Sequence, residues 1–114
     1  MVMMMMKKEV KQLVSRVNRR QLTNTQKALL ALLTAKEEWV ARTSIRVPSV
    51  GARIRDLRKS EFGSFRVTCG TATTAKVTTR TPRQTFYRLD PNSVTLSRVT
   101  KAFEGVITTN TVTK

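Results

Sequence analysis

The sequence predicts one small domain of the α+β class, with helices early in the chain and a pair of strands after them. Two patterns support this class. Apolar residues recur at helical spacing in residues 28–33 and 50–57, and they alternate with polar residues in residues 65–69 and 85–89. A threonine-rich stretch, residues 70–84, joins the two alternating segments and favours extended backbone. A chain of 114 residues can bury a modest core of this kind.

The first predicted helix covers residues 7–20 and is basic. Its apolar stripe, spaced at i, i+3, i+4 and i+7, consists of Val10, Leu13, Val14 and Val17. Lysines and arginines occupy the other faces, which suits solvent exposure, contact with phosphates, or a membrane surface. The narrow stripe carries no Trp, Phe or Tyr, which argues against a membrane.

The second predicted helix belongs in the middle of the core. Thr23 or Thr25 can cap it, and Gln26 stands three residues after Thr23, as in a capping box. Residues 28–33 are apolar on more than one side of the helix, so neighbours are expected on several sides. The helix is expected to end near Lys36.

A short strand and an irregular turn are predicted next. Residues 38–41 are typical of a strand, with Trp39 as a core or hinge aromatic, and residues 43–47 leave room for one helical turn. Pro48 cannot donate a hydrogen bond to a continuing helix and favours a break just before Ser49. Two short helices on either side of this break form a predicted helix-turn-helix.

The helix after the break, residues 49–59, has one apolar side. Ser49 is expected to cap it, because its hydroxyl can accept from a free N–H of the first turn. Val50, Ile54 and Leu57 follow at i, i+4 and i+7 and therefore share one side, which we expect to be buried.

The other side of this helix carries small and basic residues. Ala52, Arg55 and Lys59 lie away from the apolar stripe, a combination that suits the major groove of DNA. Arg53 and Asp56 stand at i and i+3 and are expected to form an orienting ion pair rather than to contact bases.

The two predicted strands alternate at period two. Their inward faces are expected to hold Phe65, Val67 and Cys69 on the first and Tyr87 and Leu89 on the second. Cys69 is then a small buried hydrophobe, and Phe86 points outward with no evident partner. The stretch between the strands is expected to form a long hairpin, and its charged residues are Lys76, Arg80 and Arg83. A final helix over residues 94–103 is expected to place Leu96, Val99 and Phe103 on one side.

Charge narrows the choice of partner. The chain has 22 Lys and Arg against 7 Asp and Glu, a net charge of +15 and a pI of about 11.5. Such a domain attracts polyanions, and its binding should depend strongly on salt. With no histidine and one cysteine, the sequence indicates no metal site, no cofactor, no disulfide and no enzyme. A reducing compartment fits best, and no apolar run approaches the length of a membrane span.

The order of these elements, with Arg53-Ile54-Arg55-Asp56-Leu57-Arg58 and a closing Tyr87-Arg88-Leu89, resembles a winged helix-turn-helix domain. The closest likeness is to small phage and bacterial DNA-binding proteins. The resemblance covers residues 22–90 and implies a three-helix core with a β-hairpin wing. Residues 1–21 and 91–114 then supply flanking helices and a flexible C-terminal tail. The glycine that usually follows the recognition helix comes a few residues late, as Gly63, and the wing is longer than a minimal one.

The resemblance implies a double-stranded DNA binder without catalysis, a small transcriptional regulator or phage accessory factor in the host cytoplasm and nucleoid. The candidate nucleic-acid contacts are Ser49, Ala52, Arg55, Lys59, Arg42, Arg46, Lys76, Arg80 and Arg83. Two alternatives stay open: a ribosome-associated RNA-binding domain, and a phage-type inhibitor of a host nucleic-acid enzyme. A homodimer is also expected, because one recognition helix reads few base pairs and the stripe of residues 10–17 needs a partner. That partner is a second copy, the final helix, or the helix of residues 28–33.

Overall fold

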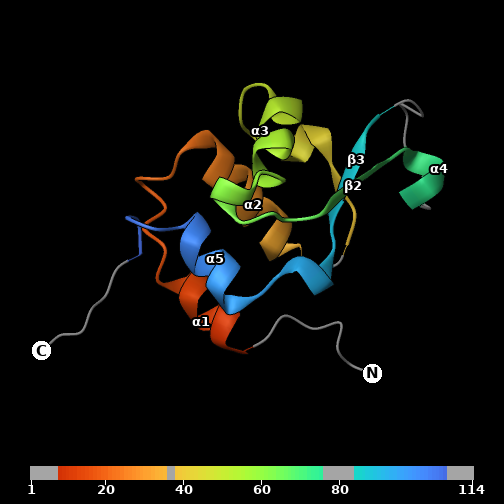
Figure 1. The fold of residues 1–114 in the computed structure, drawn as a ribbon. Coiled ribbons are helices and arrows are strands. Elements are labelled where there is room, and N and C mark those ends of the chain that lie inside the picture. Colours follow the sequence, from red (N-terminus) through yellow and green to blue (C-terminus); the bar gives the residue numbers. More distant parts are fainter. Residues whose placement is uncertain (1–7, 36–37, 76–83, 108–114) are drawn as a thin grey trace, which may run out of the picture.

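A computed structural model describes residues 8–35, 38–75 and 84–107 of the chain (Figure 1). The helices are α1 (Lys8–Ser15), α2 (Asn24–Thr34), α3 (Val50–Leu57), α4 (Ala72–Ala75) and α5 (Leu96–Ala102). The strands are β1 (Val40–Ala41), β2 (Val67–Gly70) and β3 (Phe86–Leu89). Three single 3₁₀ turns are η1 (Arg42–Ser44), η2 (Ser60–Phe62) and η3 (Pro91–Ser93). The predicted α+β class is confirmed, and within the described ranges no helix is long and apolar enough to cross a membrane.

The three strands form one antiparallel sheet in the order β1-β3-β2. Tyr87 in the central strand faces Val40 on one side and Cys69 on the other, and Val67 pairs with Leu89. The strands therefore lie where the alternation predicted them. The last strand in the chain enters between the first two, so the short strand after α2 belongs to the same sheet as the hairpin.

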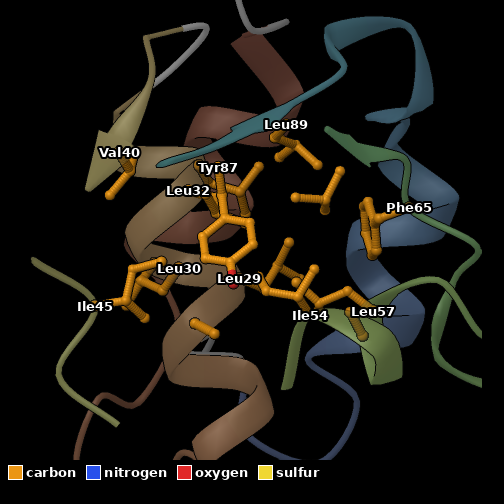
Figure 2. Close-up of a cluster of buried hydrophobic side chains, with 14 of the residues drawn as sticks. Leu29, Leu30, Leu32, Val40, Ile45, Ile54, Leu57, Phe65, Tyr87 and Leu89 are labelled. Carbon is orange, nitrogen blue, oxygen red and sulfur yellow. The ribbon is translucent and has the colours of Figure 1, made fainter. Parts of the chain in front are cut away.

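The hydrophobic core lies where α2 and α3 meet the inner face of the sheet (Figure 2). Leu29 and Leu32 of α2 face Ile54 and Leu57 of α3, and the Tyr87 ring projects into the same cluster from β3. α2 is buried on several sides, as its composition predicts.

The predicted capping box of α2 is confirmed and has a second role. The Thr23 hydroxyl accepts from the Gln26 N–H at 3.2 Å, and Gln26 Oε1 accepts from the Thr23 N–H at 2.9 Å. The other end of the same amide, Gln26 Nε2, donates to the buried Ala102 carbonyl at 2.9 Å. One side chain thus completes the start of α2 and joins it to the end of α5.

The apolar stripe of α1 packs against α5 (Figure 1). Val10 and Val99 are both fully buried, and Val17 forms a bridge with Ile107. Within the described residues, the final helix is thus the partner that the stripe needed. Two predictions about these helices are wrong. α1 ends at Ser15 rather than near residue 20, and Leu96 is 43% exposed.

Leu96 is exposed because it is the first residue of α5. The residues that pack inward, Val99, Ala102 and Phe103, come one to two turns later, so the start of the helix lies beyond the buried contact.

The outer face of the sheet is covered too, and this corrects the strand predictions. Phe86 is 6% exposed and Ala72 is 7% exposed, although neither belongs to the main core. A Cβ at Gly70 would lie 2.9 Å from Thr74 of α4 and 3.0 Å from the Trp39 ring, so these groups close over the same face. Residues 72–75 therefore form a helical turn on the sheet rather than the extended hairpin that the threonine content predicted.

Cys69 is exposed, so its predicted burial is wrong. In β2 the first residue, Val67, is buried, whereas Thr68 and Cys69 are exposed and Gly70 is half-buried. β2 is an edge strand, and the Arg58 guanidinium lies 3.8 Å from the Cys69 sulfur, so this side chain stays at the surface although it alternates with Val67.

Candidate nucleic-acid interface

α3 presents one exposed face at the surface of the domain. Val50, Ile54 and Leu57 are buried against α2 and the sheet, as predicted, so the opposite face points outward. Arg55 is exposed on that face and Ala52 is half-buried. Figure 1 shows α3 at the outer edge of the molecule, with α2 beside it.

One flank of α3 is fixed by the Asp56 carboxylate. The Thr25 hydroxyl on α2 donates to Asp56 Oδ2 at 3.0 Å. Arg53 Nη2 lies 3.5 Å from the same oxygen, which confirms the predicted ion pair, and Lys59 Nζ lies 3.4 Å from Oδ1. The hydrogen bond from Thr25 is the main reason that the pKa of Asp56 is lowered, burial opposes it, and Lys59 and Arg53 lower it further.

Lys59 differs from its prediction in two ways. α3 ends at Leu57 with Arg58 as its C-cap, so Lys59 lies beyond the helix. Its side chain is 58% exposed, and its ammonium group also forms an ion pair with the Asp56 carboxylate.

The other flank of α3 is fixed by Arg58. Its Nη2 donates to the Val67 carbonyl at 2.6 Å and lies 3.8 Å from Cys69 Sγ. Arg58 therefore ties α3 to β2, while Asp56 ties it to α2. The helix cannot rotate about its axis without breaking one of these links, so Arg55 and Ala52 are held facing outward.

The start of α3 is not capped in the way that the sequence predicted. Ser49 occupies the N-cap position, but its backbone is left-handed, with φ 53° and ψ 56°, and its side chain caps nothing. An N-cap hydroxyl acts from extended backbone, so the predicted side-chain cap is wrong. The Ser49 carbonyl instead accepts from the N–H groups of Ala52 and Arg53 at 3.0 and 3.1 Å. A left-handed serine costs about 1–2 kcal/mol, which the surrounding turn must offset.

An open groove of about 540 Å³ lies beside this turn. Its lining consists of Arg42, Thr43, Ile45, Val47, Ser49, Val50, Gln84 and Thr85. Gln84 Nε2 donates to the Thr43 hydroxyl at 2.6 Å, and the Arg42 N–H donates to the Thr85 carbonyl at 2.9 Å. These bonds join η1 to the start of β3, so the groove has a polar wall with an exposed arginine beside it.

The residues predicted to contact nucleic acid fall into several groups in the structure. Arg42 and Ser49 share the groove, Arg55 and Ala52 share the outward face of α3, and Arg46 is exposed between η1 and α3. Lys76, Arg80 and Arg83 lie outside the described residues.

Sequence reasoning missed Thr25, Thr43 and Gln84, because each acts through a residue at least 31 positions away. The sequence shows that these residues are polar, but no pattern of nearby residues indicates their hydrogen-bond partners.

Comparison with family models, with curated proteins and with solved structures finds no match to this chain.

Proposed function

We propose that the protein binds double-stranded DNA as a winged helix-turn-helix domain, with α3 as the recognition helix. The main support for this proposal is the fixed orientation of α3 in the domain. Its apolar side is buried, both flanks are tied to the domain, and a half-buried alanine and an exposed arginine face outward. The strand order β1-β3-β2 supports the same assignment, because it makes β2 and β3 a hairpin beside α3.

The dimensions of α3 suit a DNA groove. With its side chains an α-helix is about 10–12 Å across, and the major groove is about 12 Å wide, so α3, with 8 residues, can lie in the groove. Gly51 has no heavy atom within 4 Å of where a Cβ would stand, so the first turn offers little bulk at its surface. The backbone of α3 can therefore come close to base edges, with Arg55 in reach of guanine.

The basic residues around α3 then bind the phosphate backbone. Arg42 lines the groove on the protein surface beside Ser49, at the start of α3, and Arg46 is exposed nearby in the sequence. Phosphate contacts of this kind position a protein on the duplex without reading sequence. In the proposed complex Lys76, Arg80 and Arg83, in the sequence between β2 and β3, extend these contacts. A small transcriptional regulator or a phage accessory factor is the role that fits such a domain.

A binding titration with duplex DNA, duplex RNA and single strands, at two salt concentrations, tests the proposal. Arg55→Ala should weaken binding to a preferred duplex by roughly 1–3 kcal/mol and flatten the preference at one base position. Lys27→Ala is the matched control, because Lys27 is an exposed cation on a different helix, α2.

Equal affinity of the wild type and Arg55→Ala for every duplex tested, with both proteins folded, would remove the recognition-helix assignment. Tighter binding to duplex RNA than to DNA would replace the proposal by the RNA-binding alternative. No binding to any nucleic acid would favour the protein-inhibitor alternative.

A further inference from the structure

A second group of cations lies on α1 and in the segment between α1 and α2. The five basic residues of this group are Lys8, Lys11, Arg16, Arg19 and Arg20. All five are exposed, and the only acid among residues 8–20 is Glu9. Within the described residues, none of the five side chains makes a hydrogen bond or an ion pair. We call residues 8–20 the α1 basic surface.

The α1 basic surface faces away from the domain because of how α1 packs. Val10 is fully buried, and Leu13 and Val14 are packed against the core. Helical geometry places Lys8 on the side opposite these residues and Lys11 on the flank beside Val14, and both are exposed. Figure 1 shows α1 and α3 at opposite ends of the domain, with α5 and α2 between them.

We propose that the α1 basic surface binds the phosphate backbone of a second DNA duplex, so that one chain bridges two duplexes. The inference rests on the proposed function of α3. A straight duplex seated on α3 cannot also reach α1, because the body of the domain lies between them. Five unpaired positive charges attract a polyanion strongly, and without one they repel each other.

The packing of α1 favours nucleic acid over a membrane surface. A helix that lies on a membrane inserts its apolar face between the lipid head groups. In this structure that face is already covered by α5, and Val10 at its centre is fully buried. Only the charged side chains of the α1 basic surface are then free to bind a partner, and such a surface suits a phosphate backbone.

A bridging assay tests the inference. One duplex is fixed to beads, a second duplex carries a fluorophore, and capture of the second is measured against protein concentration. The wild type should capture it. A five-site variant, with Lys8, Lys11, Arg16, Arg19 and Arg20 each changed to Gln, should lose capture while it still binds a single free duplex through the α3 contacts, with lower affinity at low salt.

A two-site comparison guards against a general charge effect. Lys8→Gln with Lys11→Gln should raise the protein concentration needed for half-maximal capture by about tenfold at low salt. Lys27→Gln with Arg66→Gln removes the same two charges from exposed positions on other elements and should change it far less. Equal effects of the two pairs would overturn the assignment to α1.

The remaining outcomes separate the two proposals. No binding to a single duplex would defeat the proposed function and the inference together. Binding without capture would defeat the inference alone. Capture that survives in the five-site variant, or a free protein heavier than 12.9 kDa by light scattering at the assay concentration, would assign bridging to self-association. Binding of the wild type to phosphatidylserine vesicles without capture of the second duplex would assign the surface to membranes.

Discussion

Thr25 of α2 donates its hydroxyl hydrogen bond to Asp56 of α3 across 3.0 Å, and the two residues are 31 positions apart. Thr25 is 8% exposed, so the bond joins the core helix to the partly solvated flank of the next helix. Asp56 also forms ion pairs with Arg53 and Lys59. The same carboxylate therefore helps to fix the rotation of α3 and positions two cations.

We expect Asp56→Asn to lower the free energy of unfolding at neutral pH, and the effect should depend on pH. The folded-state pKa of Asp56 lies below its ordinary value of about 3.9, so the ionised carboxylate stabilises the fold above that value. This stabilisation is lost as the pH falls through the lowered folded pKa. Urea unfolding of both proteins from pH 7 to pH 2 measures the difference, which should shrink below about pH 4.

Thr25→Val is the companion variant for Asp56, because it removes the main cause of the lowered pKa and keeps the side-chain shape. Thr25→Val should also lower the free energy of unfolding at neutral pH. Its difference from the wild type should likewise shrink below about pH 4, where the Asp56 carboxylate becomes protonated. A stability difference between wild type and Asp56→Asn that stays constant over the whole pH range would contradict the coupling.

We expect Gln26→Ala to lower the free energy of unfolding by about 1–3 kcal/mol, because it leaves the buried Ala102 carbonyl and the Thr23 N–H without their partner. Lys27→Ala, at the exposed neighbouring position, should stay within about 0.5 kcal/mol of the wild type. Urea unfolding followed by circular dichroism compares the two. Equal effects at both positions would show that the link between α2 and α5 adds no stability.

The sequence predicts the elements whose signal is local. The capping box of α2, the buried stripe of α3 and the position of β3 depend on residues within one or two turns of each other, and all three are confirmed. The ion pair between Arg53 and Asp56 was predicted for the same reason, since helical neighbours at i and i+3 meet in any amphipathic helix.

The sequence does not predict features that depend on distant partners. The burial of Phe86 requires α4 over the outer face of the sheet, and the exposure of Cys69 depends on the position of β2 at the edge of the sheet. The left-handed backbone of Ser49 follows from the angle at which α3 must leave the turn, which no local pattern contains. The same holds for the groove, whose walls come from segments about 40 residues apart in the chain.

We expect Cys69 to react with a soluble thiol reagent in the folded protein. Its side chain is exposed on β2, and burial is what makes a cysteine inert. Spectrophotometric titration with an aromatic disulfide should label one thiol at nearly the same rate with and without urea. Cys69→Ser should leave the free energy of unfolding within about 0.5 kcal/mol of the wild type. A thiol that reacts only after unfolding would restore the buried position that the alternation predicted.

We expect opposite effects from adding one methyl group at two glycines. At Gly70 the new Cβ would meet Thr74 at 2.9 Å and the Trp39 ring at 3.0 Å, so Gly70→Ala must push α4 and the ring away from the sheet. At Gly51 the methyl group enters open space on α3, and neither glycine has a positive φ. Gly70→Ala should therefore destabilise the fold by about 1–3 kcal/mol, whereas Gly51→Ala should stabilise it by about 0.5–1 kcal/mol.

Fluorescence makes this glycine comparison specific, because Trp39 is the sole tryptophan of the chain. Gly70→Ala should change the native emission of Trp39, since its ring lies against the position that gains the methyl group. Gly51→Ala should leave the emission unchanged while it raises the midpoint of urea unfolding. If Gly70→Ala kept both the emission and the midpoint of the wild type, α4 and Trp39 would not close over the outer face of the sheet, and the burial of Phe86 would need another cause.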